Sequence, residues 1–404
     1  MTIIRFVYII FHIIMIWMFF RAGKNMSISI SDKQYWKASL PAFLAYFVVL
    51  GLRFGHNLDW NLYYIRYTEC TSFQWSSTEP IYQILLYFFN AIIGLPYFLF
   101  ISLQCVFLLY CFVLIVKEFR DKLYYVMPLF PIVVQMNDCY IRWFIAVSFF
   151  LISIYKYLRN GRLSKISSLL WFTCAVLTHN GSIILLLIYP ILLQKKHFVP
   201  PKISLLLLFL SVFVFSIAIF GFLNDFFVMI SLFGGQTIAD SNVSHYLLSV
   251  DRITSDGLND LTGVLEHSVV GNIIIFLSYT TTIIYGPKYL QCYKNGIVYY
   301  NLFVIAAILN PIFSTVEIFD RFTITLLIFN AVVSGIVFYE IVTSKRHCSL
   351  KAYLLCMVSI ACFSYPYFRY TFMVDKDYKM MYIWDAGEKE YIDPYLYYKD
   401  MGRF

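Results

Sequence analysis

The sequence predicts an all-α, polytopic membrane protein with about twelve transmembrane helices. Sixty per cent of its 404 residues are hydrophobic and 13% are charged, whereas roughly a quarter of the residues in a soluble domain carry a charge. The hydrophobic residues come in repeated blocks that are long enough to cross about 30 Å of hydrocarbon. A mean hydropathy of +0.71 agrees with this pattern, so a soluble globular fold is excluded.

Lysine and arginine lie in short clusters between the hydrophobic blocks, and these clusters set the predicted orientation. Cytoplasmic loops carry an excess of basic residues, so the net charge of +8 indicates membrane topology rather than binding to nucleic acid. Residues 224–268 hold six acidic residues and the single base Arg252, and we expect them to form a large extracytoplasmic loop. The basic clusters are residues 21–37, 117–122, 156–165, 195–202 and 345–351, with a weaker one at Lys288 and Lys294.

Helices threaded between these anchors give twelve crossings and leave both chain ends outside the cytoplasm. The first hydrophobic block lacks a small-residue cleavage site and is followed by basic residues, which is typical of a retained helix rather than a signal peptide. Residues 1–404 then form a single integral membrane domain with an extracytoplasmic tail at 369–404. The predicted spans are 2–20, 38–54, 96–116, 122–136, 140–157, 166–178, 182–194, 203–223, 269–286, 297–313, 322–342 and 350–368.

Residues 79–94, EPIYQILLYFFNAIIG, are hydrophobic but do not fit as a thirteenth span. Counting them would move the basic cluster at 117–122 to the outside. The segment is short. Its hydrophobic part follows Pro80, and it ends at Gly94. We therefore predict an amphipathic helix that lies in the outer interface, within a first extracytoplasmic loop at 53–95.

The block from 166 to 194 must enter the membrane and return, because basic clusters flank both of its ends. Each arm has about 13 residues, which reach only about 20 Å as a helix. The turn THNGS at 178–182 is therefore expected below the outer surface, inside protein rather than lipid. His179 occupies the vertex of this hairpin.

Unusual polar residues fall on the predicted outer side at four places in the chain. Each has an ordinary structural explanation: Arg53 could snorkel to the interface, Arg142 could pair with Asp138, and Asp320 with Arg321 could be a loop pair. Three arginines near hydrocarbon depth with acids and a histidine nevertheless favour a functional site. The residues are Arg53, His56, Asp59, Tyr63 and Glu79, then Asn137, Asp138 and Arg142, then His179, and finally Glu317, Asp320 and Arg321.

Several of these residues lie in motifs that resemble the EpsG family of Wzy-type polysaccharide polymerases. The resemblance covers roughly residues 45–195, with weaker support from FDRFTI and DPY. The motifs are GLRFGHNLDWNLYY, EPIYQILLYFFNAIIGLPY, the helix IRWFIA and the hairpin THNGS. The chain departs from the family pattern at Leu58, where a glycine is usual before the aspartate, and at Trp143, where a glutamine usually follows the arginine.

The resemblance implies an O-antigen, capsular or exopolysaccharide polymerase in the bacterial cytoplasmic membrane, with its active site on the extracytoplasmic face. Such an enzyme transfers a glycan from polyprenyl pyrophosphate to a second lipid-linked repeat unit. A fold similar to the GT-C glycosyltransferases is expected. The implied partners are the polyprenyl-pyrophosphate-linked oligosaccharide, membrane lipid, a flippase and a chain-length regulator.

This chemistry suggests a role for each polar residue. The pyrophosphate leaving group needs cations, and the planar fork of arginine suits phosphate oxygens, so Arg142 and Arg321 come first and Arg53 third. Tyr63 and Glu79 are expected beside them in the same substrate site. The acceptor hydroxyl needs one base, which either His179 or Asp59 can supply.

No metal or other cofactor is expected. The nine cysteines are scattered without a CxxC pair, and the acids of 224–268 are dispersed. We expect this loop to cover the glycan groove and to set substrate specificity.

Three other functions remain open at this point. A flippase or exporter of the lipid-linked oligosaccharide would show internal repeats and charges at midplane depth. A polyprenyl-phosphate-sugar-dependent glycosyltransferase would have a similar outer site. A membrane O-acyltransferase would need a histidine on the cytoplasmic side.

Overall fold

The computed structural model confirms the all-α class. It describes residues 3–54, 58–73, 79–134, 140–159, 161–215, 269–313, 317–343, 349–373, 380 and 382–384. Within these ranges every regular element is a helix, and extended pairing occurs only at an isolated bridge between Arg53 and Tyr382.

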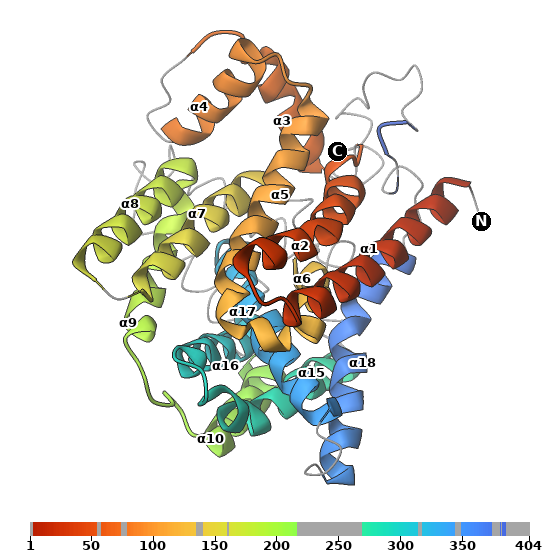
Figure 1. Cartoon of the computed structure of the whole chain (residues 1–404), viewed down its shortest axis with the longest axis vertical. Coiled ribbons are helices and arrows are strands. Elements are labelled where there is room, and N and C mark those ends of the chain that lie inside the picture. The colour runs from red at the N-terminus through yellow and green to blue at the C-terminus, as the bar shows by residue number, and fades with distance from the viewer. Residues whose placement is uncertain are drawn as a thin grey trace.

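The helices form one packed bundle (Figure 1). Short π-helical turns extend α2, α4 and α10, and 3-10 helices follow α5 and α8. The α-helices are α1 (Ile3–Ser27), α2 (Asp32–Tyr46), α3 (Leu58–Glu69), α4 (Pro80–Tyr87), α5 (Tyr97–Val116), α6 (Leu123–Val133), α7 (Ile141–Tyr157), α8 (Arg162–Thr178), α9 (Tyr189–Leu192), α10 (Pro201–Leu210), α15 (Val269–Leu290), α16 (Gly296–Phe313), α17 (Glu317–Thr343) and α18 (Leu350–Phe372).

Six helical stretches in the described residues are long and hydrophobic enough to cross a membrane. The chain is therefore a multi-pass membrane protein, but the predicted number of about twelve crossings is not confirmed. The predicted span 140–157 and the predicted arm 166–178 correspond to α7 and α8, each of 17 residues. The six stretches are Ile3–Ser27, Tyr97–Val133, Val269–Leu290, Gly296–Phe313, Arg321–Thr343 and Leu350–Phe372.

The stretch Tyr97–Val133 covers most of two predicted spans, 96–116 and 122–136. Its 37 residues would reach about 55 Å as one straight helix, nearly twice the hydrocarbon thickness. The backbone breaks at Phe119, whose φ of −103° and ψ of 28° are not helical. This break divides α5 from α6 inside the basic cluster at 117–122, where the sequence placed a cytoplasmic turn.

The helix α17 runs through the centre of the bundle and contacts α6, α15, α16 and α18. Most of its apolar side chains are fully buried. Gly335 permits the close approach to α6, because a Cβ at this position would lie 2.6 Å from the Cα of Val126. Small residues allow helix backbones to approach in this way in membrane bundles.

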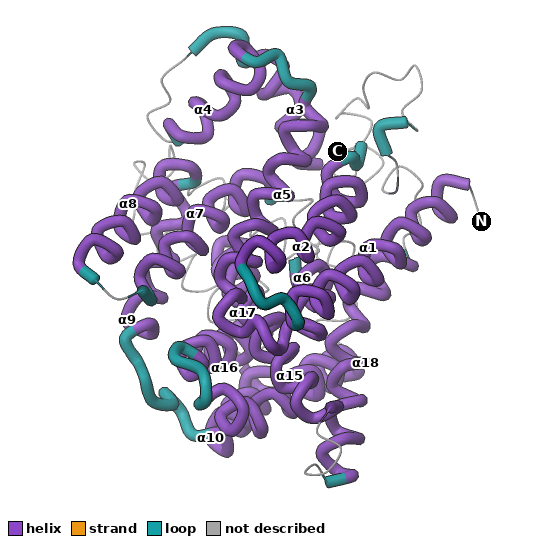
Figure 2. Tube along the Cα trace, in the orientation of Figure 1, coloured by secondary structure: helices purple, strands orange, loops and turns teal. Residues whose placement is uncertain are grey.

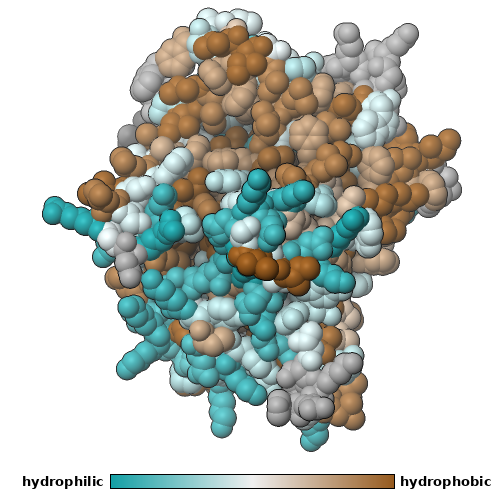
Figure 3. Space-filling model, viewed as in Figure 1, coloured by the Kyte–Doolittle hydropathy of each residue, from teal (hydrophilic) through white to brown (hydrophobic). Residues whose placement is uncertain are grey.

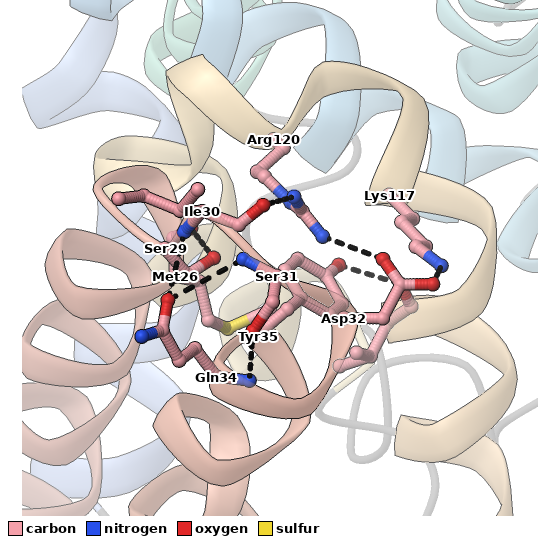
Figure 4. A network of polar contacts seen from close by, with 10 residues as sticks. Met26, Ser29, Ile30, Ser31, Asp32, Gln34, Tyr35, Lys117 and Arg120 are labelled. Atoms are coloured by element: carbon pink, nitrogen blue, oxygen red, sulfur yellow. Dashed lines mark hydrogen bonds and ion pairs between the residues drawn. The ribbon is translucent and has the colours of Figure 1, made fainter.

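Several of the predicted basic clusters meet at one end of the bundle. Asp32, at the start of α2, pairs with Lys117 at 2.5 Å and with Arg120 at 2.8 Å (Figure 4). Lys122 pairs at 2.8 Å with Glu340 near the end of α17. The ends of α1, α5 and α17 therefore lie on the same side.

The surface around this end is polar. The turn between α1 and α2 lies in the middle of the viewed face in Figure 2. Figure 3 shows hydrophilic residues gathered around and below this turn, whereas the upper and right edges of the same face are hydrophobic. This division is typical of a protein whose polar loops protrude from a lipid-covered belt.

A segment near the C-terminus packs against the N-terminal part of the chain. The backbone of Arg53 forms the isolated bridge with Tyr382, and the amide of Ile383 donates to the carbonyl of Leu52 at 3.1 Å. The ring of Tyr382 is fully buried and meets the ring of Phe11 on α1 edge-on at 5.2 Å.

The segment predicted as an interfacial helix is helical, with α4 followed by a π-helical turn at Phe88–Ile92. Gly94 ends it with a φ of +69°, a left-handed conformation that glycine adopts without steric cost. The position of this helix relative to the membrane surface stays a prediction.

Candidate active site

Arg142 lies in the first turn of α7 and joins three elements. Its Nη1 atom forms an ion pair with Oε2 of Glu79, the residue before α4. Its Nε atom donates at 2.7 Å to the hydroxyl of Tyr63 on α3. About a quarter of the Arg142 side chain remains exposed (24%).

The guanidinium of Arg142 also lies over two aromatic rings. Its carbon atom is 5.2 Å from the ring centre of Tyr63 and 5.8 Å from that of Tyr82 on α4. Aromatic faces attract guanidinium groups. The rings of Tyr63 and Tyr82 therefore hold the guanidinium of Arg142 in its orientation.

His179 lies between α8 and the 3-10 helix Asn180–Ile188, where its extended backbone makes the turn of the hairpin. Its Nδ1 atom is 3.3 Å from Oε1 of Glu79. Its Nε2 atom is 3.2 Å from Nη1 of Arg321. Glu79 therefore contacts Arg142 with one carboxylate oxygen and His179 with the other.

Arg321 lies in the first turns of α17, and its guanidinium carbon is 4.8 Å from the ring centre of Tyr140. Thr325, one turn later, accepts a hydrogen bond at 3.0 Å from the indole Nε1 of Trp143. The Trp143 ring meets the imidazole of His179 edge-on at 5.4 Å. Trp143 therefore links α7 to α17 through a hydrogen bond and packs edge-on against the imidazole of His179.

The surroundings keep His179 neutral at physiological pH. The pKa of His179 is lowered to about 3, chiefly by burial and in smaller part by the guanidiniums of Arg321 and Arg142. A buried imidazole between two cations loses solvation and gains repulsion when it takes a proton. The contact between Nδ1 and Glu79 is therefore that of a neutral ring.

Gly181 leaves room for the imidazole. A Cβ at this position would lie 3.3 Å from Cε1 of His179, and the Gly181 amide donates to Nδ1 at 3.2 Å. The glycine in THNGS therefore lets the backbone approach the ring.

The sequence profile of the EpsG family matches residues 38–382, which is most of the chain. The chain belongs to the EpsG family. This membership indicates a polysaccharide polymerase-like membrane protein of glycosyltransferase type. No curated protein and no solved structure match the chain, so a fold similar to the GT-C glycosyltransferases stays a prediction.

The structure brings five of the predicted site residues of this EpsG-family chain together: Arg142, Arg321, His179, Glu79 and Tyr63. They come from segments as far apart in sequence as α3 and α17. Their roles in substrate binding and catalysis are not tested by this geometry and stay predictions.

Arg53 is placed differently. Its side chain is fully buried, and Nη1 donates to the carbonyl of Leu50 and lies 3.7 Å from Sγ of Cys105. Its role in pyrophosphate binding stays a prediction.

Other predicted elements lie outside the described residues. These are the side chains of His56, Asp59, Asn137, Asp138, Glu317 and Asp320, the whole loop 224–268 and the tail after residue 384. Among the side chains that the structure does describe, no three His, Cys, Asp or Glu residues gather as metal ligands. Independence from metal stays a prediction.

Sequence reasoning missed Tyr82, Tyr140 and Trp143 as parts of the site. Tyr140 lies two residues before Arg142, and Trp143 directly follows it. The departure from the family glutamine at 143 was read as a lost amide, but the indole N–H at this position bonds α17 instead. Aromatic residues are so abundant in this chain, with 34 Tyr and 40 Phe, that composition could not single them out.

Proposed function

We propose that this protein is a Wzy-type polymerase of polysaccharide repeat units. It transfers a glycan from polyprenyl pyrophosphate to a lipid-linked repeat unit at the outer face of the bacterial cytoplasmic membrane. The observation that carries the proposal is the cluster around the neutral imidazole of His179: Arg321 contacts the ring directly, and Arg142 is linked to it through the carboxylate of Glu79.

The two guanidiniums suit a diphosphate leaving group. Both present planar N–H donors, and arginine binds phosphate oxygens through pairs of such donors. Polyprenyl diphosphate is already a stable anion, so it needs cations around it rather than a proton donor. The same cations stabilise the negative charge that develops on the diphosphate as its bond to the sugar breaks. The proposed reaction therefore needs no metal ion.

His179 is the base that we favour for the acceptor. In the transfer, the acceptor oxygen forms a bond to the anomeric carbon, and the bond from that carbon to the diphosphate oxygen breaks. The electron pair of the broken bond leaves on the polyprenyl diphosphate, and the hydroxyl proton passes to His179. Asp59 remains the alternative base.

The position of the site along α17 supports an outer-face reaction. Arg321 lies near one end of this helix, and Glu340, which pairs with Lys122 of a basic cluster, lies near the other. Their separation of 19 positions corresponds to about 28 Å along the helix, close to the hydrocarbon thickness. If the basic clusters are cytoplasmic, as such clusters usually are, the site opens on the opposite surface.

A flippase or exporter of the lipid-linked oligosaccharide is less well supported. Transporters of this kind bind their substrate near the bilayer midplane, between repeated halves. Here the two guanidiniums lie near the beginnings of α7 and α17. A polyprenyl-phosphate-sugar-dependent glycosyltransferase would use a similar site and differs in its donor. We propose a flippase and a chain-length regulator as partners rather than as activities of this chain.

Deletion of the gene followed by analysis of the surface glycan tests the proposal. Loss of a polymerase is expected to leave single repeat units on lipid or on their usual acceptor outside the cell, whereas loss of a transporter leaves none there. The accumulated units then serve as substrate for the purified protein in liposomes. Formation of longer glycan with release of polyprenyl diphosphate confirms the activity, and its absence contradicts it.

A further inference from the structure

The two ring nitrogens of His179 face three polar partners. Nδ1 lies 3.3 Å from Oε1 of Glu79 and also 3.2 Å from the amide nitrogen of Gly181, which donates to it. Nε2 lies 3.2 Å from Nη1 of Arg321. Glu79 when ionised can only accept a hydrogen bond, and Arg321 can only donate one.

A neutral imidazole cannot satisfy all three partners, because it has one N–H and one acceptor nitrogen. With its proton on Nδ1, the ring donates to Glu79 and accepts from Arg321 at Nε2, while the N–H of Gly181 loses its acceptor. With its proton on Nε2, the ring accepts from Gly181 at Nδ1, but its N–H then points at the N–H of Arg321.

Charge favours the first arrangement. Hydrogen bonds that involve an ionised partner are roughly twice as strong as those between neutral groups. The Nδ1–H tautomer makes two charge-assisted bonds, whereas the Nε2–H tautomer makes one bond to a neutral amide. We propose that Glu79 is a positioning residue that holds the proton of His179 on Nδ1 and so reserves the Nε2 lone pair for the acceptor hydroxyl.

This inference rests on the proposed function and adds an order of events to it. Nε2 has a single lone pair, and Arg321 uses it. The acceptor hydroxyl cannot deliver its proton there until the guanidinium turns to another anion. An oxygen of the diphosphate is a stronger acceptor for a guanidinium than a neutral imidazole is. Binding of the diphosphate donor therefore releases the base.

Glu79 also stabilises the state that follows proton transfer. When Nε2 takes the hydroxyl proton, the ring becomes a cation whose Nδ1–H still faces the Glu79 carboxylate. The negative diphosphate beside Arg321 and Arg142 offsets the repulsion that otherwise disfavours this cation. A carboxylate that orients a histidine base and stabilises its protonated form works in this way in hydrolase triads.

The tautomer can be measured in the protein alone, by NMR of the purified protein in detergent with ¹⁵N-labelled histidine. The two neutral tautomers and the imidazolium give different correlation patterns between ring nitrogens and carbon-bound protons. His179→Gln assigns the signal among the seven histidines. We expect Nδ1 to be protonated in the wild type and the preference to be lost in Glu79→Ala.

Tyr63→Phe is the matched control, because it removes a partner of Arg142 without touching His179. It is expected to keep the Nδ1–H pattern. A wild-type signal with the proton on Nε2 overturns the proposal. Saturating inorganic pyrophosphate is expected to shift the Nε2 resonance, and an unchanged resonance overturns the release of the base.

Kinetics of the purified polymerase separate positioning from a purely structural role. Glu79→Gln keeps an oxygen for Arg142 but loses the charge that fixes the ring. We expect kcat to fall about 100-fold or more, with little change in KM for the lipid-linked donor. A higher KM with unchanged kcat would mean that Glu79 acts only through Arg142. The NMR result needs no substrate, so a failure of the polymerase assay does not affect it.

Discussion

The Nε2 atom of His179 lies 3.2 Å from Nη1 of Arg321, although 142 positions separate the two residues in the chain. The contact joins the turn after α8 to the first turns of α17. It places a cation against the atom that would serve as a base. The same guanidinium can therefore hold a leaving group and control access to His179.

Replacement of Arg142 with lysine should impair the reaction although the positive charge is kept. Lysine loses the planar fork and the Nε bond to Tyr63. We expect kcat/KM for polymerisation to fall at least about 100-fold. Arg159→Lys, beyond the other end of α7, is the control and should stay near the wild type. Full-length glycan at the normal rate from Arg142→Lys would remove the argument for paired phosphate contacts.

The hydrogen bond between Trp143 and Thr325 should be measurable as a coupling energy. A double-mutant cycle with Trp143→Phe and Thr325→Val isolates it from the loss of packing. We expect a coupling of about 1 kcal/mol in the free energy of unfolding in detergent. Trp143→Phe combined with the remote Thr281→Val should be additive within about 0.5 kcal/mol. Additivity in both cycles would contradict the bond.

The stability of the protein should depend on pH through His179. The pKa of its folded form is lowered to about 3 by burial and then by Arg321 and Arg142, whereas the unfolded chain has an ordinary value of about 6.5. Between these values the unfolded state binds more protons, so stability falls as the pH is lowered through this window.

His179→Gln removes this proton uptake on unfolding. The fall in melting temperature of the detergent-solubilised protein between about pH 6.5 and pH 4 should become shallower. His197→Gln, at an exposed position, tests whether the loss of a histidine elsewhere has the same effect. An identical slope in the wild type and in His179→Gln would show that the imidazole is not held neutral.

Substitution of Gly181 with alanine should affect activity more than stability. The added methyl group would lie 3.3 Å from Cε1 of His179 and would displace the ring by a few tenths of an ångström. We expect kcat to fall about tenfold to 100-fold, with the melting temperature nearly unchanged. Ser182→Ala, at the next position, provides the comparison. Wild-type kcat in Gly181→Ala would mean that the ring position is not critical.

Labelling with a membrane-impermeant maleimide should place the two ends of the bundle on opposite sides. In a background without other cysteines, Asn180→Cys beside His179 should react from outside the cell. In a second background that keeps only Cys292, which is exposed and lies near Lys122 of the basic end, this thiol should react only after the membrane is opened. Labelling of Asn180→Cys from the cytoplasmic side alone would invert the topology and contradict the outer-face reaction.

From the sequence, the grouping of the polar residues could be predicted better than the number of membrane crossings. Arg142, His179 and Arg321 are polar residues in hydrophobic surroundings, and such residues must find one another or a ligand. Hydropathy alone cannot distinguish a full span from a half-length arm. The segment 182–194 illustrates this, because much of it forms the 3-10 helix Asn180–Ile188 rather than an α-helix.

Contacts between side chains on different helices were not predictable in the same way. The bond from Trp143 to Thr325 depends on the rotation of α7 against α17, which the hydrophobic pattern of either helix leaves open. Nothing in the spacing of Glu79 and Arg142 indicates that one carboxylate also reaches His179. The segment 224–268, which carries most of the predicted specificity, lies outside the described residues.

The bridge between Arg53 and Tyr382 has a consequence for biogenesis. The ribosome releases Arg53 and α1 long before it makes Tyr382, yet the ring of Tyr382 packs against Phe11. The packing of α1 and of the turn after α2 is therefore completed by a segment that is synthesised after all the helices from α3 to α18. Truncations before this residue should leave the earliest helices inserted but unfinished, and a C-terminal fusion would report on their assembly.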